Sequence, residues 1–263
     1  MILLSFDTEE FDLPREHGVD ISLEESMKVS VYGTCKILDC LKRNNVRATF
    51  FCTANFVENA PDVVARIISE GHEIASHGVD HFVPKPTDVS QSKAIIEELA
   101  EWQKIYGYRQ PRMFAVSNKD IKACGYIYNS SLNPAFIPGR YMHLDMPRTC
   151  FMQDGVLQIP ASVTPVLRFP LFWLSNHVLP VKLYHWLIKY TLKHDGYFTT
   201  YMHPWEFYNL KDHPEWKIQG IIKMNSGDAL IRRLDKLVSM LKNTGDEFVT
   251  YAEFAKKKIN ELT

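Results

Sequence analysis

The sequence has few cysteines, almost no excess charge and no long apolar run, and each of these features argues against one class of protein. Its five cysteines among 263 residues form no Cys-x-x-Cys pair, so most are expected to be reduced and structural, as in the cytoplasm. The formal net charge of -1 gives no indication of nucleic-acid binding. No apolar stretch is long enough to span a membrane.

The first residues also lack the features of an export signal. Residues 1–10, MILLSFDTEE, have no basic region, and their apolar run is far too short for a signal peptide. We interpret them as the first strand of the fold. A cytoplasmic location is therefore expected, and a substrate made inside the cell fits better than an external polymer.

The sequence does contain a regular alternation of strand-like and helical patterns, with an apolar fraction of 46% that is enough for a sizeable core. Strands are expected at 1–6, 46–53, 72–78, 112–117, 126–131, 197–203 and 247–251. Helices are expected at 23–45, 60–71, 88–107, 119–125, 180–196, 226–245 and 252–262. This order favours βα units around a parallel sheet, with residues 1–263 as one domain and long loops within 128–175.

Four carboxylates, Asp7, Glu9, Glu10 and Asp12, follow the first expected strand. Active groups of parallel α/β folds lie at the carboxyl ends of strands. Clustered carboxylates beside an apolar core are costly without a compensating cation, so a bound metal ion is one explanation. Glu10 and Asp12 are interpreted as solvated loop residues.

Histidines follow two further expected strands. His77 and His81 are four positions apart, a spacing that puts both rings on one face of a helical turn. Two histidines and a carboxylate are a common ligand set for zinc or a similar ion, although this spacing also occurs by chance in ordinary loops. His203 lies where a mostly apolar strand meets a loop, and it is either a site residue or a core histidine. Arg109, just past a helix end, is either functional or a solvated cap.

Five segments occur in a fixed order along the chain: SFDTE (5–9), GHEIASHGVDH (71–81), YRQP (108–111), YNSS (128–131) and YMHPWEF (201–207). Together they resemble the polysaccharide deacetylase family, also called the NodB-homology or carbohydrate esterase family 4 superfamily. The resemblance is greatest to the branch with peptidoglycan deacetylases and allantoinase-like proteins. It implies an α/β fold, a distorted (β/α) barrel that often has seven strands.

The resemblance also implies an activity, the hydrolysis of N-acetyl groups from an acetylated amino sugar. By this resemblance Asp7 matches the catalytic base, and Arg109 matches the arginine that orients it. His203 matches the general acid. The sugar could belong to a polysaccharide, an oligosaccharide or a lipid-linked or nucleotide-linked precursor.

The metal ligands implied by the resemblance are His77 and His81 with one acidic residue. Many family members carry two adjacent aspartates, but Thr8 occupies the second place here. We therefore expect Glu9 to be the third ligand, with Glu10 as the alternative. The expected cofactor is one divalent metal ion. Zn²⁺ is the first choice, but the sequence leaves the identity of the metal open.

Candidate substrate contacts come from later segments. Trp205 either forms an apolar wall for the acetyl methyl group or simply packs in the core. Tyr141 and Arg140 are candidate sugar or phosphate contacts, although an ordinary structured loop is the more common explanation of such residues. Residues 163–193 are apolar and aromatic with cations at the edges, which allows either a peripheral membrane contact or core plus a dimer surface.

Two other functions fit parts of the pattern. One is a metal-independent C–N hydrolase, a deformylase or an allantoinase-like enzyme, on the same fold. The other is a non-catalytic sugar-binding protein, which only the Asp-Thr-Glu departure supports.

Overall fold

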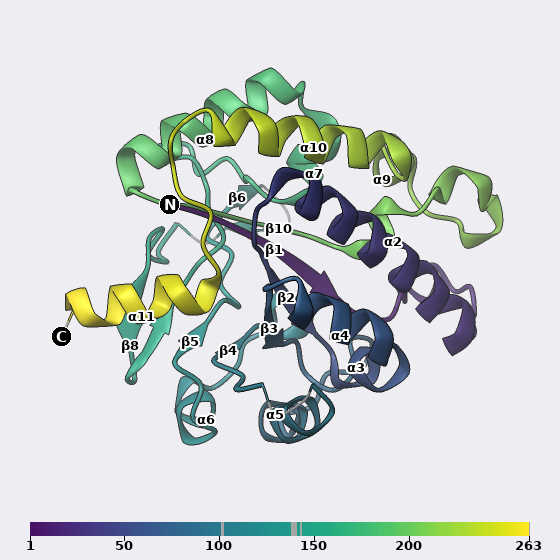
Figure 1. Cartoon of the computed structure of the whole chain (residues 1–263), viewed down its shortest axis with the longest axis horizontal. Coiled ribbons are helices and arrows are strands. Elements are labelled where there is room, and N and C mark those ends of the chain that lie inside the picture. Colours follow the sequence, from purple (N-terminus) through teal and green to yellow (C-terminus); the bar gives the residue numbers. More distant parts are fainter. Residues whose placement is uncertain (101–102, 138–140, 143, 263) are drawn as a thin grey trace.

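The largest sheet has the strand order β10-β1-β2-β3-β4-β5-β9-β8 (Figure 1). The computed structural model describes residues 1–100, 103–137, 141–142 and 144–262. Its strands are β1 (Ile2–Thr8), β2 (Thr49–Cys52), β3 (Glu73–Ser76), β4 (Gly107–Tyr108), β5 (Tyr128–Asn129), β8 (Phe151–Gln153), β9 (Val156–Gln158) and β10 (Phe198–Met202). Strands β6 (Phe136–Ile137) and β7 (Tyr141–Met142) form a separate antiparallel pair.

All neighbouring strands from β10 to β9 run parallel, and only β8 is antiparallel to its neighbour β9. The expected α/β fold with a distorted, NodB-like barrel is therefore confirmed, and the parallel part has the expected seven strands. The carboxyl ends of these strands meet at one edge of the sheet, where active groups of such folds are found.

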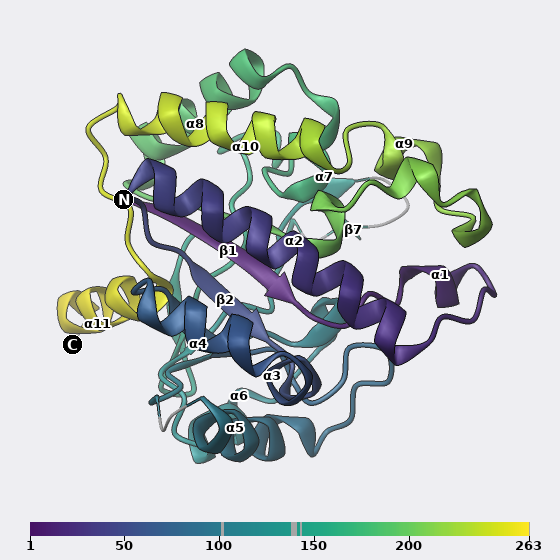
Figure 2. The same ribbon diagram turned by 45° about the vertical axis from the view of Figure 1, so that its right-hand side comes forward.

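Helices cover the outside of this sheet (Figures 1 and 2). The α-helices are α1 (Leu13–Glu16), α2 (Leu23–Asn44), α3 (Ala54–Asn59), α4 (Pro61–Ser69), α5 (Asp88–Leu99), α6 (Asn118–Ala123), α7 (Trp173–Val178), α8 (Val181–Asp195), α9 (Gly220–Lys223), α10 (Asp228–Lys242) and α11 (Tyr251–Leu262). Short 3₁₀ helices are η1 (Pro111–Met113), η2 (Pro204–Phe207), η3 (Leu210–Asp212) and η4 (Pro214–Trp216). Helix α11 lies where β1 begins, whereas α1 lies beyond the end of β1 (Figure 2). None of the described helices is both long enough and apolar enough to cross a membrane.

Helix α2 shows how local sequence sets an element's limits. Ser22 accepts a hydrogen bond from the backbone N–H of Glu25 at 3.1 Å, which satisfies one of the free donors at the helix start. Asn45 ends the helix in the left-handed region, with φ of 50°. The helix therefore starts and stops where its capping residues stand.

The alternation of side chains along β1 separates two cores. Ile2, Leu4 and Phe6 pack outward in the cluster that joins the sheet to the helices. Leu3 packs inward, in a cluster with residues from β2, β5 and α11. Since side chains of a strand alternate, Asp7 lies on the same inner side as Leu3, further along β1. The barrel interior is therefore apolar near α11 and polar near the carboxyl ends of the strands.

Side chains join β10 to the segment that follows β9. The backbone N–H of Ser162 donates to Thr199 Oγ1 at 3.1 Å, and the backbone N–H of Thr199 donates to Ser162 Oγ at 2.9 Å. Thr199 Oγ1 also donates to the Pro160 carbonyl at 3.1 Å. We call these contacts the seam of the barrel.

Two expected strands are wrong. In place of a strand at 112–117, Pro111–Met113 form η1, and Arg112 and Met113 have positive φ values of 57° and 53°. The strand of this unit is the two-residue β4 instead. In place of a strand at 247–251, only Phe248 makes an isolated parallel bridge to Ile2.

Candidate functional site

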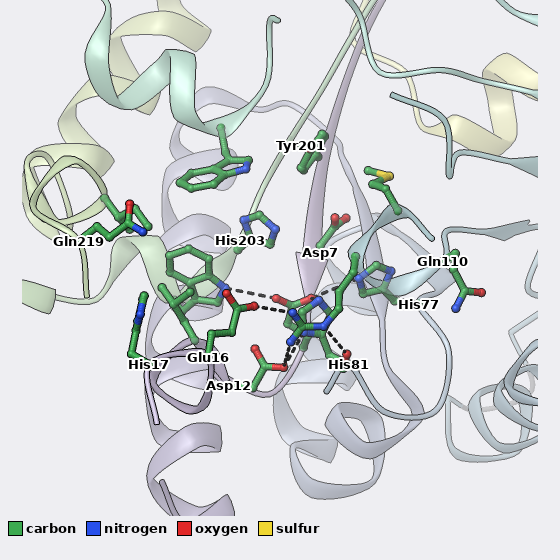
Figure 3. A pocket seen from close by; sticks show the side chains of 17 residues that line it. Asp7, Asp12, Glu16, His17, His77, His81, Gln110, Tyr201, His203 and Gln219 are labelled. Carbon is green, nitrogen blue, oxygen red and sulfur yellow. Dashed lines mark hydrogen bonds and ion pairs between the residues drawn. The ribbon is translucent and has the colours of Figure 1, made fainter. Parts of the chain in front are cut away.

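A cavity of about 240 Å³ opens at the carboxyl ends of the parallel strands (Figure 3). Its walls include the predicted site residues Asp7, Glu9, His77, His81, His203 and Trp205. Strand β1, the loop after β3 and the end of β10 thus bring residues from three distant parts of the chain to one pocket. Arg109 lies behind this wall rather than in it.

Three potential metal ligands converge on one side of the pocket. The Nε2 atoms of His77 and His81 each lie 3.2 Å from Glu9 Oε2. One ligand atom from each residue lies within 4.8 Å of the other two. The structure thus brings together the three residues that the sequence predicted as ligands. Glu10 Oε2 accepts a hydrogen bond from Thr53 at 3.1 Å instead.

The second nitrogen of each histidine fixes the direction of the first. His77 Nδ1 donates to the Arg109 carbonyl at 2.8 Å, and His81 Nδ1 donates to Asp12 Oδ2 at 2.8 Å. Since Nδ1 of each ring donates a proton, Nε2 of each ring faces Glu9 and can offer a lone pair to a cation there. Acceptors that hold the outer nitrogen in this way are typical of metal-binding histidines.

The donor set fits a cation. Glu9 Oε2 is buried and has no hydrogen-bond partner within the described residues, although its Oε1 accepts from Trp205 Nε1 at 3.3 Å. A buried carboxylate oxygen beside two imidazole nitrogens is unfavourable unless a positive charge, a proton or a metal ion, lies between them. Burial alone would lower the pKa of His81, but Glu9 and Asp12 raise it to about 9. The site therefore attracts positive charge, and nitrogen and oxygen ligands suit Zn²⁺.

Asp7 and Arg109 form a buried ion pair beside these ligands. Arg109 Nη1 donates to Asp7 Oδ1. Burial would raise the pKa of Asp7, but Arg109, His77 and His203 outweigh it and lower the pKa below its usual value. The guanidinium is fully used by the following acceptors: Asp7, Ser5 Oγ, the Ser130 carbonyl, Ser130 Oγ and the Tyr251 hydroxyl. Arg109 is thus not a solvated cap.

His203 lies across the pocket from the histidine pair, with Asp7 between them (Figure 3). Its Nδ1 donates to Glu206 Oε1 at 2.8 Å, which leaves Nε2 for the cavity. Burial would lower the pKa of His203, but the hydrogen bond to Glu206 and the charges of Glu9, Glu206 and Asp7 raise it. A protonated imidazole is therefore favoured at this position.

Aromatic rings enclose His203. Trp205 stacks on it with ring centroids 4.9 Å apart, and Trp173 from α7 meets it edge-on at 5.6 Å. Trp205 also lines the cavity, as the sequence suggested, and it holds Glu9. The backbone of Tyr141 lies in β7, whereas Arg140 lies outside the described residues.

Two carboxylates that were interpreted as solvated are buried. Asp12 is 6% exposed, and it accepts hydrogen bonds from His81 and from Arg112 Nη2, the latter at 3.0 Å. Glu10 is 7% exposed, and burial raises its pKa to about 7. The interpretation was wrong because the partners that enclose Asp12 lie 69 and 100 positions away in the sequence.

Sequence reasoning missed Glu206, His177 and Arg112. Glu206 is fully buried and links His203 to His177 from α7. The spacing of His203 and Glu206 in HPWE was the available signal, because side chains three positions apart meet on a helical turn. His177 and Arg112 carry no such local signal.

Residues 24–123 match the family model described as polysaccharide deacetylase. Over 48 residues the chain is 50% identical to the peptidoglycan-N-acetylglucosamine deacetylase of Bacillus cereus. The matched segment is 18% of this chain and 18% of that protein. The matched segments span about a fifth of the length of the first curated relatives.

Solved structures resemble the whole chain. A putative polysaccharide deacetylase from Mycobacterium smegmatis is 18% identical and superposes with a TM-score of 0.69, covering 100% of this chain and 91% of that one. PuuE allantoinase is 14% identical, with a TM-score of 0.62 over 97% of this chain and 88% of that one. Such low identities establish the shared fold only.

Proposed function

Because the chain belongs to the polysaccharide deacetylase family, we propose that it is a metal-dependent hydrolase that removes N-acetyl groups from an acetylated amino sugar. Residues 1–263 would form its single catalytic domain. One observation carries the proposal: a charged carboxylate, a three-residue metal-ligand set and a histidine with a raised pKa face one cavity. Family relatives named for deacetylating peptidoglycan and chitooligosaccharides support the substrate class.

Glu9, His77 and His81 would hold the divalent ion, with Zn²⁺ as the proposed metal. When bound, such an ion supplies Lewis acidity toward the amide carbonyl and toward water. Asp12 and the Arg109 carbonyl would keep the two rings oriented, since they accept the Nδ1 protons.

Asp7 is proposed as the general base that accepts a proton from the attacking water. A base must be ionised before it can accept a proton, and Arg109 keeps Asp7 ionised through a buried, charge-assisted hydrogen bond. The same contact fixes one oxygen of Asp7 and thereby its orientation. Arg109 thus acts through Asp7 and not on the substrate.

His203 is proposed as the general acid. An amine leaves an amide with difficulty unless it receives a proton, and the Nε2–H of protonated His203 faces the cavity. Trp205 and Trp173 would exclude water from this side and provide an apolar wall for the acetyl methyl group. Tyr141 and Arg140 remain proposed sugar contacts.

Acetate release from a panel of acetylated chitooligosaccharides, peptidoglycan fragments and nucleotide-linked amino sugars tests the proposal. We expect at least one substrate to be deacetylated, with activity lost on chelation and restored by Zn²⁺. Activity that survives complete chelation would instead support the metal-independent C–N hydrolase, to be tested with formamide and cyclic ureide substrates. If none of these is hydrolysed, a sugar-binding function replaces the enzyme.

A cytoplasmic location and a peripheral membrane contact through residues 163–193 remain part of the proposal. All five cysteines are free thiols, which is usual in reducing compartments. Within that segment Val166 and Leu167 are 77% exposed and Trp186 is 60% exposed, with Lys182 and Lys189 also exposed on α8. Exposed apolar and basic side chains suit an anionic lipid surface.

Co-sedimentation with anionic vesicles tests the membrane contact. Binding should weaken for Trp186→Ser, whereas Leu262→Ser, which alters an exposed leucine on α11, should bind like the wild-type protein. Absence of wild-type binding at low salt would remove the membrane contact from the proposal.

A further inference from the structure

Glu206 joins two histidines inside the fold. Its Oε1 accepts from His203 Nδ1 at 2.8 Å and from the backbone N–H of His203 at 2.6 Å. Its Oε2 lies 2.7 Å from His177 Nε2. Glu206 and His177 are completely buried, so water does not compete for these contacts.

The surroundings of His177 indicate which nitrogen carries its proton. Within the described part of the chain, His177 Nδ1 is buried and has no hydrogen-bond partner. A buried N–H without an acceptor is costly, and a protonated ring would place both a charge and such an N–H there. His177 therefore carries its proton on Nε2 rather than on Nδ1, and it donates that proton to Glu206.

His177 thus occupies one oxygen of Glu206, and the other oxygen accepts from His203. Burial would raise the pKa of Glu206, but its hydrogen bonds with His177 and His203 lower the pKa below the usual value. Tyr184 from α8 is a further titratable group near Glu206. Two other acidic groups raise the pKa of His203: Glu9, just after β1, and Asp7, within β1.

Packing holds both ends of this arrangement. A Cβ atom on Gly33 of α2 would lie 1.8 Å from the Pro204 carbonyl oxygen, so η2 packs directly on the helix backbone. The His177 carbonyl accepts from Asn225 Nδ2 at 2.5 Å, and Trp173 meets the His177 ring edge-on at 5.9 Å. The three side chains are thus set by α2, α7 and η2 rather than by a loose loop.

We infer that Glu206 and His177 are positioning residues for the proposed general acid. Glu206 holds Nδ1–H of His203 so that Nε2 faces the cavity. His177 holds the other oxygen of Glu206, so the carboxylate keeps one orientation and stays ionised. The inference rests on the proposed function for the role of His203, but the arrangement itself can be tested without any activity.

Variants of His177 separate this role from simple packing. His177→Phe keeps a ring but removes the donor, whereas His177→Gln keeps an N–H donor for Glu206. General acid catalysis contributes about 10²–10⁴-fold, so His177→Phe should lower kcat roughly tenfold with little change in KM. It should also move the alkaline limb of the kcat profile to lower pH, and His177→Gln should restore most of both.

Glu206→Gln keeps the size of the side chain and removes its charge. It should shift the alkaline limb to lower pH more strongly than His177→Phe, because the charge that favours protonated His203 is gone. His194→Phe, a change at an exposed histidine of α8, should leave the profile unchanged. An unshifted limb in both Glu206→Gln and folded His177→Phe would overturn the inference.

Nitrogen-15 NMR of histidine-labelled wild-type protein gives the second test, which needs neither a variant nor a substrate. We expect His177 to carry its proton on Nε2 alone from pH 6 to 8, and His203 to keep Nδ1 protonated in the same range. A doubly protonated His177, or His203 protonated only on Nε2, would overturn the inference. Failure of every deacetylase assay with the expected NMR result would instead reject the proposed function and keep the arrangement.

Discussion

The residues of the pocket depend on one another through buried charges. Arg109 is 1% exposed and uses all its donors, so Asp7 is both its counter-charge and the proposed base. Removing one partner of a buried ion pair leaves the other uncompensated, which typically costs about 3–5 kcal/mol. Changes at Asp7 should therefore affect both chemistry and stability.

Asp7→Asn should lower kcat by about 10²–10⁴-fold, because an amide cannot accept the proton from water. Its melting temperature should also fall, since Arg109 loses its counter-charge. Acetate release per folded molecule and thermal denaturation measure the two effects. Asp20→Asn, at an exposed position, is the matched control. Full activity of Asp7→Asn would assign the base to another group.

Asp12→Asn should weaken metal binding by about 10–100-fold, the usual effect of losing a carboxylate that orients a metal-binding histidine. The amide still accepts from His81 but carries no charge. Titration against a chromogenic chelator measures the affinity.

His77→Ala should reduce the bound metal further, and unchanged metal content in that variant would remove His77 from the ligand set.

At the scale of elements, the contact between α2 and η2 sets the position of His203. Gly33→Ala should destabilise the protein by about 1–3 kcal/mol, the usual cost of overpacking, because its new methyl group meets the Pro204 backbone. Activity should fall as well, since His203 directly precedes Pro204. Gly220→Ala is the matched control, because a Cβ there meets nothing within 4 Å. Equal melting temperatures for the two variants would contradict this account.

Glu73 links β2, β3, β5 and α11. It accepts hydrogen bonds from Thr49, Tyr128 and the backbone N–H of Ala252, yet burial raises its pKa from 4.5 to about 7. The folded state thus binds more protons than the unfolded state between these values. Stability should therefore fall as pH rises through this window, by at most about 3 kcal/mol from Glu73.

Glu73→Gln should flatten this pH dependence, because the amide has no charge to desolvate. Urea denaturation at pH 5 and pH 8 measures the difference in unfolding free energy for each protein. Glu98→Gln, on the exposed face of α5, should keep the wild-type slope. If the unfolding free energy of Glu73→Gln changes with pH as much as that of the wild-type protein, another group is responsible for the pH dependence.

At the scale of the whole molecule, periodicity predicted the elements that are long or strongly patterned. Helices such as α2 and α10 and the strand β10 fall within the expected ranges, and β1 overlaps the expected strand at 1–6 but continues to Thr8. The expected strand at 112–117 failed because Arg112 and Met113 have positive φ values, which an extended strand does not allow, and Phe114 is 55% exposed. Strand β4 has only two residues, which is too short for any alternating pattern.

The candidate site was predictable to a similar extent. Asp7 and Glu9 lie at the carboxyl end of a clearly patterned strand, and the spacing of His77 and His81 is local, so the sequence alone pointed to them. Asp12 looked like an ordinary loop residue, since its burial depends on partners far along the chain. His177 and Glu206, 29 positions apart, meet only because α7 folds against η2.

The hydroxyl contacts between Ser162 and Thr199 have a consequence for motion. In place of a backbone ladder there are two hydrogen bonds from backbone N–H groups to side-chain hydroxyls, and such bonds contribute about 1 kcal/mol each. The barrel should therefore open more readily between Ser162 and Thr199 than between the paired strands β1 and β2. Deuterium would then enter the amides of Ser162 and Thr199 first, and a bulky ligand could widen the barrel from this side without unfolding it.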